Sequence, residues 1–226
     1  RLLELTLTGK DCGMEERAPM CGIPYHASEI YIKKLIDLGL KVAVCEQLTD
    51  PSESKGLVVR DVIKIVTPGT LTESSMLDDS KNNYIGAVFV NGQDCSVCFA
   101  DISTGAVSLF KKSGKNIQSE IINELSRFSP KELLFNKDFL DFKEVSAFIK
   151  EQLECSVQLL DDEEFAPEKN TDSVLKQCNA EDLSELKIGD DISSVSAVCG
   201  LFSYIYDTQK ALVGRFTEIT VYSDNN

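Results

Sequence analysis

The sequence predicts an α/β protein in which a small mixed α/β domain precedes a larger domain with a mixed sheet flanked by helices. Three consecutive β-rich runs begin at residue 84, and Asn91-Gly92 between the first two is a strong hairpin signal. Helical and strand-like patterns then alternate up to residue 212, which indicates an α/β layer arrangement. A polar linker is expected at 76–83, so that the first domain covers 1–75.

The elements of the first domain follow from periodicity and from turn residues. Residues 1–8 alternate apolar and polar, with Leu3, Leu5 and Leu7 on one face of a half-buried strand. Ser28 is placed to cap a helix that Gly39 ends. The expected order is a strand at 1–8, a loop at 10–17, a helix at 29–38, a buried strand at 40–45, a turn-rich loop at 50–56 and a strand at 57–66.

The larger domain is expected to span residues 84–212. Its elements should be strands at 84–90, 95–102 and 106–110, a helix at 117–128, a strand at 132–135, a helix at 138–153, a strand at 156–160, and helices at 172–178 and 192–212. This order matches the ribonuclease H-like topology. Residues 213–226 are expected to begin a further region.

Charge is unevenly distributed along the 226 residues, whose formal net charge is −14. Residues 1–75 hold nine Lys and Arg against eleven Asp and Glu, a balance of −2, whereas residues 76–226 have a balance of −12. Because an acidic surface repels phosphates, any contact with DNA is expected in the first part.

Cysteine and hydropathy patterns favour a reduced, cytoplasmic protein without a metal or cofactor of its own. Cys95 and Cys98 form a Cys-x-x-Cys pair, but there is no second pair and only one histidine. Their spacing in a strand puts the two thiols on opposite faces. Cys45, Cys178 and Cys199 lie in apolar sequence and are predicted to be core residues.

No apolar run approaches the roughly 20 residues needed to cross a bilayer, and no secretory leader pattern opens the chain. No contact with a membrane is therefore expected. The chain begins at Arg1 within a strand-like pattern, so we expect it to be a piece of a longer protein.

A proline-framed segment stands out at 19–27, Pro-Met-Cys-Gly-Ile-Pro-Tyr-His-Ala. Gly22 permits close approach of the backbone to another molecule, and Pro19 and Pro24 reduce the entropy of holding the segment in place. Such a segment is typical of a presented loop. His26 can donate to a phosphate, and Tyr25 is amphipathic.

This segment, together with Gln47, Gly-Leu-Val-Val-Arg at 56–60 and Thr-Pro-Gly-Thr at 67–70, resembles the MutS family of DNA mismatch-recognition proteins. The resemblance implies that residues 1–75 are the later part of a mismatch-recognition domain. Residues 84–212 would be the ribonuclease H-like connector domain, and residues 213–226 the entry into the core and lever region.

The resemblance also implies what this chain lacks. The family's Gly-x-Phe-Tyr-Glu wedge motif and its Gly-x-x-x-x-Gly-Lys-Ser/Thr phosphate loop are both absent, so the chain itself should neither insert the wedge nor hydrolyse ATP. ATP and Mg²⁺ are implied for the full-length protein, as are a homodimer and a MutL-type partner that contacts the connector. Mismatched double-stranded DNA is the implied ligand.

The residues that the resemblance nominates for DNA contact are Pro19, Met20, Gly22, Tyr25, His26 and Arg60, with Lys64, Lys10 and Lys55 as weaker candidates. Structural alternatives remain open for several of them. Met20 and Ile23 could be core residues, His26 could cap the following helix, and Arg60 could lie on a solvated strand face.

Two other functions remain open. Asp101 ends a strand at a position where ribonuclease H-like nucleases carry a metal-binding carboxylate. Its partners would have to come from 161–164 or 190–191, and Asp101 could instead close a turn with Ser103 and Thr104. The acidic domain could also serve as a protein-binding adaptor.

Overall fold

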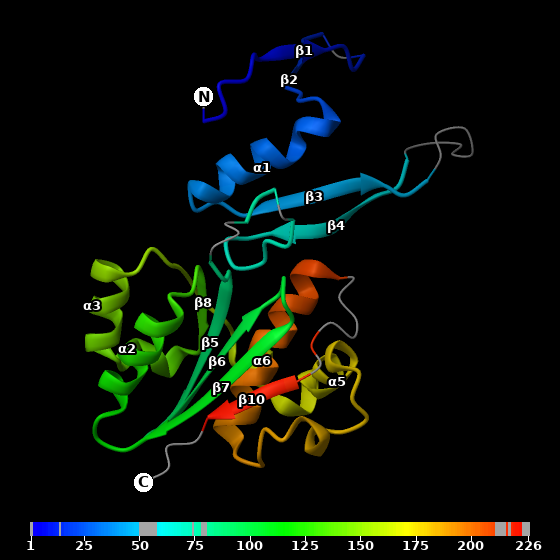
Figure 1. The fold of residues 1–226 in the computed structure, drawn as a ribbon. Coiled ribbons are helices and arrows are strands. Elements are labelled where there is room, and N and C mark those ends of the chain that lie inside the picture. The colour runs from blue at the N-terminus through cyan, green and yellow to red at the C-terminus, as the bar shows by residue number, and fades with distance from the viewer. Residues whose placement is uncertain are drawn as a thin grey trace.

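The computed structural model describes residues 2–13, 15–49, 58–73, 75–77, 81–210, 216 and 218–222. We call residues 2–77 the N-terminal unit and residues 81–222 the second unit. The N-terminal unit lies across one end of the second unit, and its β1–β2 hairpin is the part furthest from the second unit (Figure 1).

The second unit is built on one mixed sheet. Its strands are β5 (Tyr84–Asn91), β6 (Asp94–Asp101), β7 (Ala106–Ser113), β8 (Glu132–Phe135), β9 (Ser156–Leu159) and β10 (Glu218–Tyr222), in the spatial order β10-β7-β6-β5-β8-β9. The strands β5, β6 and β7 are antiparallel neighbours, and β8 and β9 are added in parallel beside β5. This arrangement confirms the predicted ribonuclease H-like mixed sheet.

Helices cover both faces of this sheet (Figure 1). They are α2 (Ile117–Phe128), α3 (Lys143–Gln152), α4 (Asp162–Phe165), α5 (Pro167–Cys178) and α6 (Ile192–Gln209), with short 3-10 turns η2 (Lys137–Asp141) and η3 (Leu183–Leu186). The helices α2 and α3 bury one hydrophobic core against the sheet, and α4, α5 and α6 bury a second core on the opposite face.

Strand alternation divides the buried side chains between the two cores. Cys95 lies in the core beneath α2, whereas Cys98 lies in the core beneath α6. The prediction that these thiols point to opposite faces is therefore confirmed. Burial raises the pKa of both thiols above the usual range, so each behaves as a small apolar side chain.

The N-terminus of α6 is capped by Asp191, whose carboxylate accepts a hydrogen bond from Ser194 N at 3.0 Å. We expect Asp191→Ala to lower the free energy of unfolding by about 1 kcal/mol in urea titrations at neutral pH. Asp190→Ala is the matched control, because Asp190 is an exposed neighbour outside this cap. An equal loss in both variants would contradict the capping role.

The Asp191 cap also makes the stability of the fold depend on pH. Burial would raise the pKa of Asp191, but hydrogen bonds from Ser194 and the Lys111 ammonium bring it below the usual value. A depressed pKa in the folded state means that the stabilisation is present above the unfolded pKa, about 3.9, and is lost as the pH falls through the lower folded pKa. The difference in free energy of unfolding between the wild type and Asp191→Ala should therefore become smaller at acidic pH.

The N-terminal unit contains two small sheets and one helix. Its elements are β1 (Thr8–Lys10), β2 (Ala18–Met20), the 3-10 turn η1 (Tyr25–Ala27), α1 (Ser28–Asp37), β3 (Val42–Gln47) and β4 (Arg60–Val66). The strands β1 and β2 pair with each other, β3 and β4 pair antiparallel, and α1 packs on β3–β4 through a small core that contains Ile36 and Val66.

Several predictions about the N-terminal unit were wrong. The strand expected at 1–8 is replaced by the short β1, because Glu4 adopts a positive φ of 54° that interrupts extended backbone. Leu7 is 72% exposed, and Cys45 is exposed because a two-stranded sheet buries only one face. Ser28 is the first residue of α1 rather than its cap, a position that Ala27 takes.

Other differences concern the second unit. The helix expected at 138–153 is divided into η2 and α3, because Phe142 has non-helical backbone angles and packs beside Phe139. The last helix ends at Gln209, and β10 beyond it pairs in parallel with β7. The structure therefore adds residues 218–222 to the sheet of the second unit, whereas the sequence placed them in a following region.

Candidate nucleic-acid interface

The proline-framed segment forms a presented turn that leads into α1. Pro24 is extended, with φ −61° and ψ 139°, and Ala27 N donates to Pro24 O at 3.0 Å to close the single turn η1. Tyr25 is 89% exposed and His26 is also exposed. The turn therefore offers an aromatic side chain and an imidazole to solvent.

The alternatives for this segment can now be decided in part. Met20 is 44% exposed at the end of β2, so it is not a core residue, whereas Ile23 is half-buried. The N-terminus of α1 receives no capping hydrogen bond from a side chain, so His26 does not cap this helix. Pro19 pairs with Gly9 on the exposed hairpin.

Gly22 has open space around it and no unusual backbone angle. A Cβ placed there would meet no atom within 4 Å among the described residues. The fold of the described chain therefore does not require a glycine at this position.

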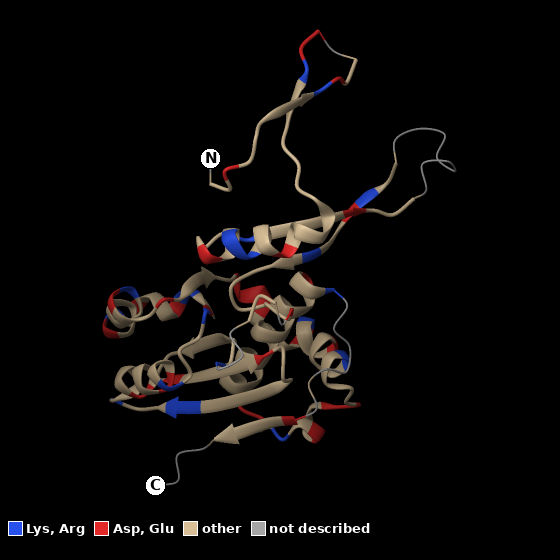
Figure 2. Ribbon diagram, turned by 45° about the horizontal axis from the view of Figure 1, so that its top comes forward, with Lys and Arg blue, Asp and Glu red and all other residues tan. Residues whose placement is uncertain are grey.

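Arg60 begins β4 and is exposed, opposite Gln47 at the end of β3. The starts of α1 and β4 lie at the same end of the N-terminal unit, as Figures 1 and 2 both show. Since β4 is seven residues long, Arg60 lies about 20 Å from its other end, where the chain meets the second unit. The turn η1 and Arg60 therefore lie at the same end of the N-terminal unit, which we call the free end.

Lys64 lies in the middle of β4 and is already engaged. Its ammonium forms a half-buried ion pair with Glu73 at 2.5 Å and lies 3.4 Å from Thr72 Oγ1. Burial would raise the pKa of Glu73, but the hydrogen bond and charge of Lys64 hold it below the usual value. Lys64 therefore has less freedom to reach a phosphate than Arg60.

One of the weaker cationic candidates lies on the β1–β2 hairpin. Lys10 ends β1 and is exposed, while Lys55 lies outside the described residues. Arg17 was not nominated from the sequence, yet its side chain lies beside Gly9 on the same exposed hairpin. Arg17 could have been identified as a cation that directly precedes the Ala-Pro at the start of the second hairpin strand.

Asp101 closes a turn, as its structural alternative predicted. Its Oδ1 accepts hydrogen bonds from Ser103 N at 2.9 Å and Ser103 Oγ at 2.6 Å, with Thr104 N at 3.4 Å. The side chain is only 1% exposed. Across the described ranges, no three His, Cys, Asp or Glu side chains cluster closely enough to hold a metal ion.

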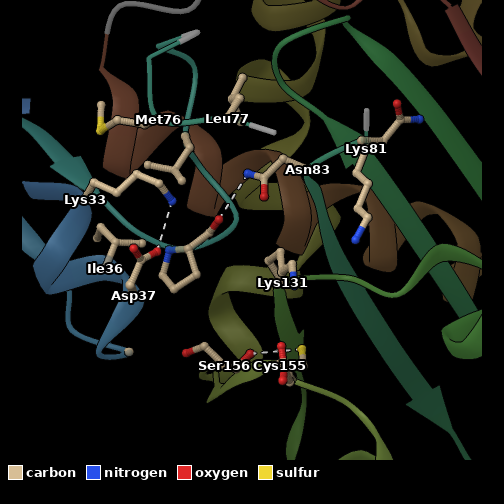
Figure 3. Close-up of a pocket in the computed structure, with 15 residues that line it drawn as sticks. Lys33, Ile36, Asp37, Met76, Leu77, Lys81, Asn83, Lys131, Cys155 and Ser156 are labelled. Carbon is tan, nitrogen blue, oxygen red and sulfur yellow. Dashed lines mark hydrogen bonds and ion pairs between the residues drawn. The ribbon is translucent and has the colours of Figure 1, made fainter. Parts of the chain in front are cut away.

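An open crevice of about 740 Å³ separates parts of the two units (Figure 3). Its walls come from α1, the segment after β4 and the start of β9, and they mix lysines with apolar side chains. None of the nominated residues that the structure describes lines it. None of the helices in the described part of the chain has the length and hydrophobicity to cross a bilayer.

The fold and the exposed turn define a two-unit α/β protein with a ribonuclease H-like second unit. Family models described as MutS domain I and MutS domain II match residues 1–75 and 83–219. The chain belongs to the MutS family.

Curated relatives named DNA mismatch repair protein MutS are similar along nearly the whole chain. Those from Clostridium tetani (strain Massachusetts / E88) and Clostridium botulinum (strain 657 / Type Ba4) are each 44% identical, over 94% and 98% of this chain respectively. That from Acetivibrio thermocellus is 39% identical over 98% of the chain. The chain spans only 23–25% of the length of these relatives.

Proposed function

We propose that this chain supplies part of the mismatched-DNA-binding surface of a MutS-type mismatch-repair protein. The observation that carries this proposal is the exposed turn η1, which lies with Arg60 at the free end of a unit matching MutS domain I. The relatives' name supports mismatch repair as the process. Pro19, Met20, Gly22, Tyr25, His26 and Arg60 form the proposed surface, with Lys64 at its margin.

Charge supports this assignment. The first 75 residues are nearly neutral, whereas the remainder carries a balance of −12. A duplex approaching the chain is therefore repelled by the second unit and tolerated by the N-terminal unit. A mismatched step also bends and unstacks at lower cost than a paired one, so a surface that presses on the backbone there gains selectivity.

The second unit is proposed to be the connector, which couples the DNA-binding unit to an ATPase and to a MutL-type partner. Its acidic side chains, many of them exposed, suit an interaction surface for proteins rather than for DNA. Hydrolysis of ATP with Mg²⁺, and dimerisation, belong in this proposal to the rest of a longer cytoplasmic protein. This chain itself would act by binding and coupling, without catalysis.

The DNA-binding proposal predicts a salt-dependent effect of replacing the hydrogen-bonding side chain of His26 and the cationic side chain of Arg60. We expect the double variant His26→Ala, Arg60→Ala to weaken binding of the 226-residue chain to a mismatched duplex and to lower the slope of log affinity against log salt by about one, for the lost contact between Arg60 and a phosphate. Fluorescence anisotropy with a labelled duplex measures both quantities.

Lys150→Ala is the matched control, because Lys150 is an exposed cation on α3 of the second unit. It should leave affinity and slope unchanged. An unchanged slope in the double variant, or an equal change in the control, would refute the proposed surface. Since the wedge motif is absent from this chain, preference for a mismatch over a matched duplex should be weak.

A further inference from the structure

A buried carboxylate joins the two units. Glu132 is 0% exposed at the start of β8, and both of its oxygens are used. Its Oε2 accepts hydrogen bonds from Thr67 Oγ1 and from Gly69 N at 3.2 Å. Its Oε1 accepts from Tyr204 OH at 2.7 Å and lies 3.1 Å from Lys41 Nζ.

Three of these four donors belong to the N-terminal unit. Lys41 directly precedes β3, and Thr67 and Gly69 follow β4, whereas Tyr204 alone comes from the second unit. An ionised carboxylate out of water is unfavourable unless it is paired and hydrogen-bonded. If the N-terminal unit moved away, Glu132 would keep only the Tyr204 hydroxyl among these donors.

The turn at residues 67–70, which supplies the donors Thr67 and Gly69, approaches this carboxylate closely. Thr67 N donates to Thr70 Oγ1 at 3.0 Å, and Thr70 N donates to Thr67 O at 3.2 Å, so the turn is held before it meets Glu132. A Cβ on Gly69 would lie 2.8 Å from Cβ of Glu132 and 2.8 Å from Cβ of Ile85. The Thr-Pro-Gly-Thr motif therefore belongs to the junction of the units.

Further polar contacts surround this centre. Lys41 Nζ also donates to Tyr204 OH at 2.7 Å, lies 5.1 Å from the centre of its ring, and contacts Gln158 Oε1 on β9. Asn83 Nδ2 donates to Pro68 O at 3.0 Å beside the crevice, as Figure 3 shows. The contacts thus come from several elements of the second unit.

The hydrophobic cores, by contrast, do not cross the junction. The small core around Ile36 and Val66 contains only residues of the N-terminal unit, and the two larger cores contain only residues of the second unit, among those described. The open crevice lies on one side of the junction. Interfaces of this kind, more polar than a core, permit relative motion of domains unless specific contacts oppose it.

We propose that Glu132 is a positioning residue. It is the central acceptor of a polar latch that holds the N-terminal unit in one orientation on the second unit. The latch consists of Lys41, Thr67, Gly69, Glu132 and Tyr204. It sets the direction in which the free end of the N-terminal unit points. The latch would fix this orientation whether or not the N-terminal unit binds DNA, so the two proposals can fail separately.

Residual dipolar couplings of the isotope-labelled 226-residue chain test this latch, because they report the orientation of each unit independently of stability. In the wild type both units should fit one alignment. In Lys41→Met and in Glu132→Gln the couplings of the N-terminal unit should be averaged, with loss of the common alignment. Lys41→Arg, which keeps the positive charge, should retain the common alignment of the two units.

Lys33→Met is the matched control, since Lys33 lies on α1 and its ion pair with Asp37 stays within that helix. It should keep the common alignment. A single alignment in Lys41→Met, or an equal loss in Lys33→Met, would overturn the latch. If Glu132→Gln does not fold, Lys41→Met decides alone, because this lysine lies at the surface.

Discussion

Replacing Phe202 by alanine is expected to lower the free energy of unfolding by about 3–5 kcal/mol. Phe202 is fully buried in the middle of α6, and its ring packs edge-on against Phe216 with centroids 4.9 Å apart. Truncation removes a ring from the core between α6 and the sheet, where the surrounding side chains are close-packed and relax only partly. Since domains of this size are stable by only about 5–15 kcal/mol, the loss is a large share of the total.

Urea unfolding followed by circular dichroism measures this loss. Tyr25→Ala is the matched control, because it also removes an aromatic ring, but one that is 89% exposed. The control should change stability little. A similar midpoint for the Phe202→Ala variant and the wild type would contradict the position of α6 in the core.

Gly200→Val is the second substitution with a large expected effect. A Cβ on Gly200 would lie 2.3 Å from Cδ1 and 2.4 Å from Cε1 of Phe165, closer than real side chains approach. Phe165 is itself buried and lies beside Phe89, with ring centroids 5.2 Å apart, so it has little room to move. Overpacking of this kind costs about 1–3 kcal/mol, and here we expect the upper end or more.

Thermal unfolding of Gly200→Val against Gly22→Val separates a packing effect from a general effect of replacing glycine. The second variant introduces the same side chain where nothing lies within 4 Å. It should unfold close to the wild-type temperature. Equal losses in the two variants would show that the contact between α4 and α6 is not as tight as the structure describes.

Local patterns predicted the second unit well. The apolar stripe at 117–128 and the short apolar run at 132–135 correspond to α2 and β8 residue for residue, because each element buries a face that its own periodicity reveals. The hairpin at Asn91-Gly92 was also confirmed, because its signal lies in two adjacent residues.

The N-terminal unit was predicted less well, because little of it is buried. The leucines at 1–8 alternate as a strand would, but alternation alone does not provide a pairing partner, and among the described residues β1 pairs only with the three residues of β2. Cys45 was expected in a core because its neighbours are apolar, yet the small core of the N-terminal unit takes Val42 and Val44 of β3 and leaves Cys45 exposed.

The candidate surface could be predicted in composition but not in arrangement. Proline and glycine spacing indicated a presented segment, and the exposure of Tyr25 and His26 agrees with it. That Arg60 shares an end of the unit with them depends on the β3–β4 register. The latch was missed altogether, because Lys41 and Tyr204 are 163 residues apart and Glu132 looks like an ordinary strand residue.

The central claim is that a duplex meets the free end of the N-terminal unit and avoids the second unit. Titrating the isotope-labelled chain with a short mismatched duplex and following amide chemical shifts by NMR tests this most directly, since it detects weak binding residue by residue. We predict shifts confined to residues 8–27 and 58–62. Shifts concentrated within residues 84–209, with none at Tyr25, His26 or Arg60, would contradict the account.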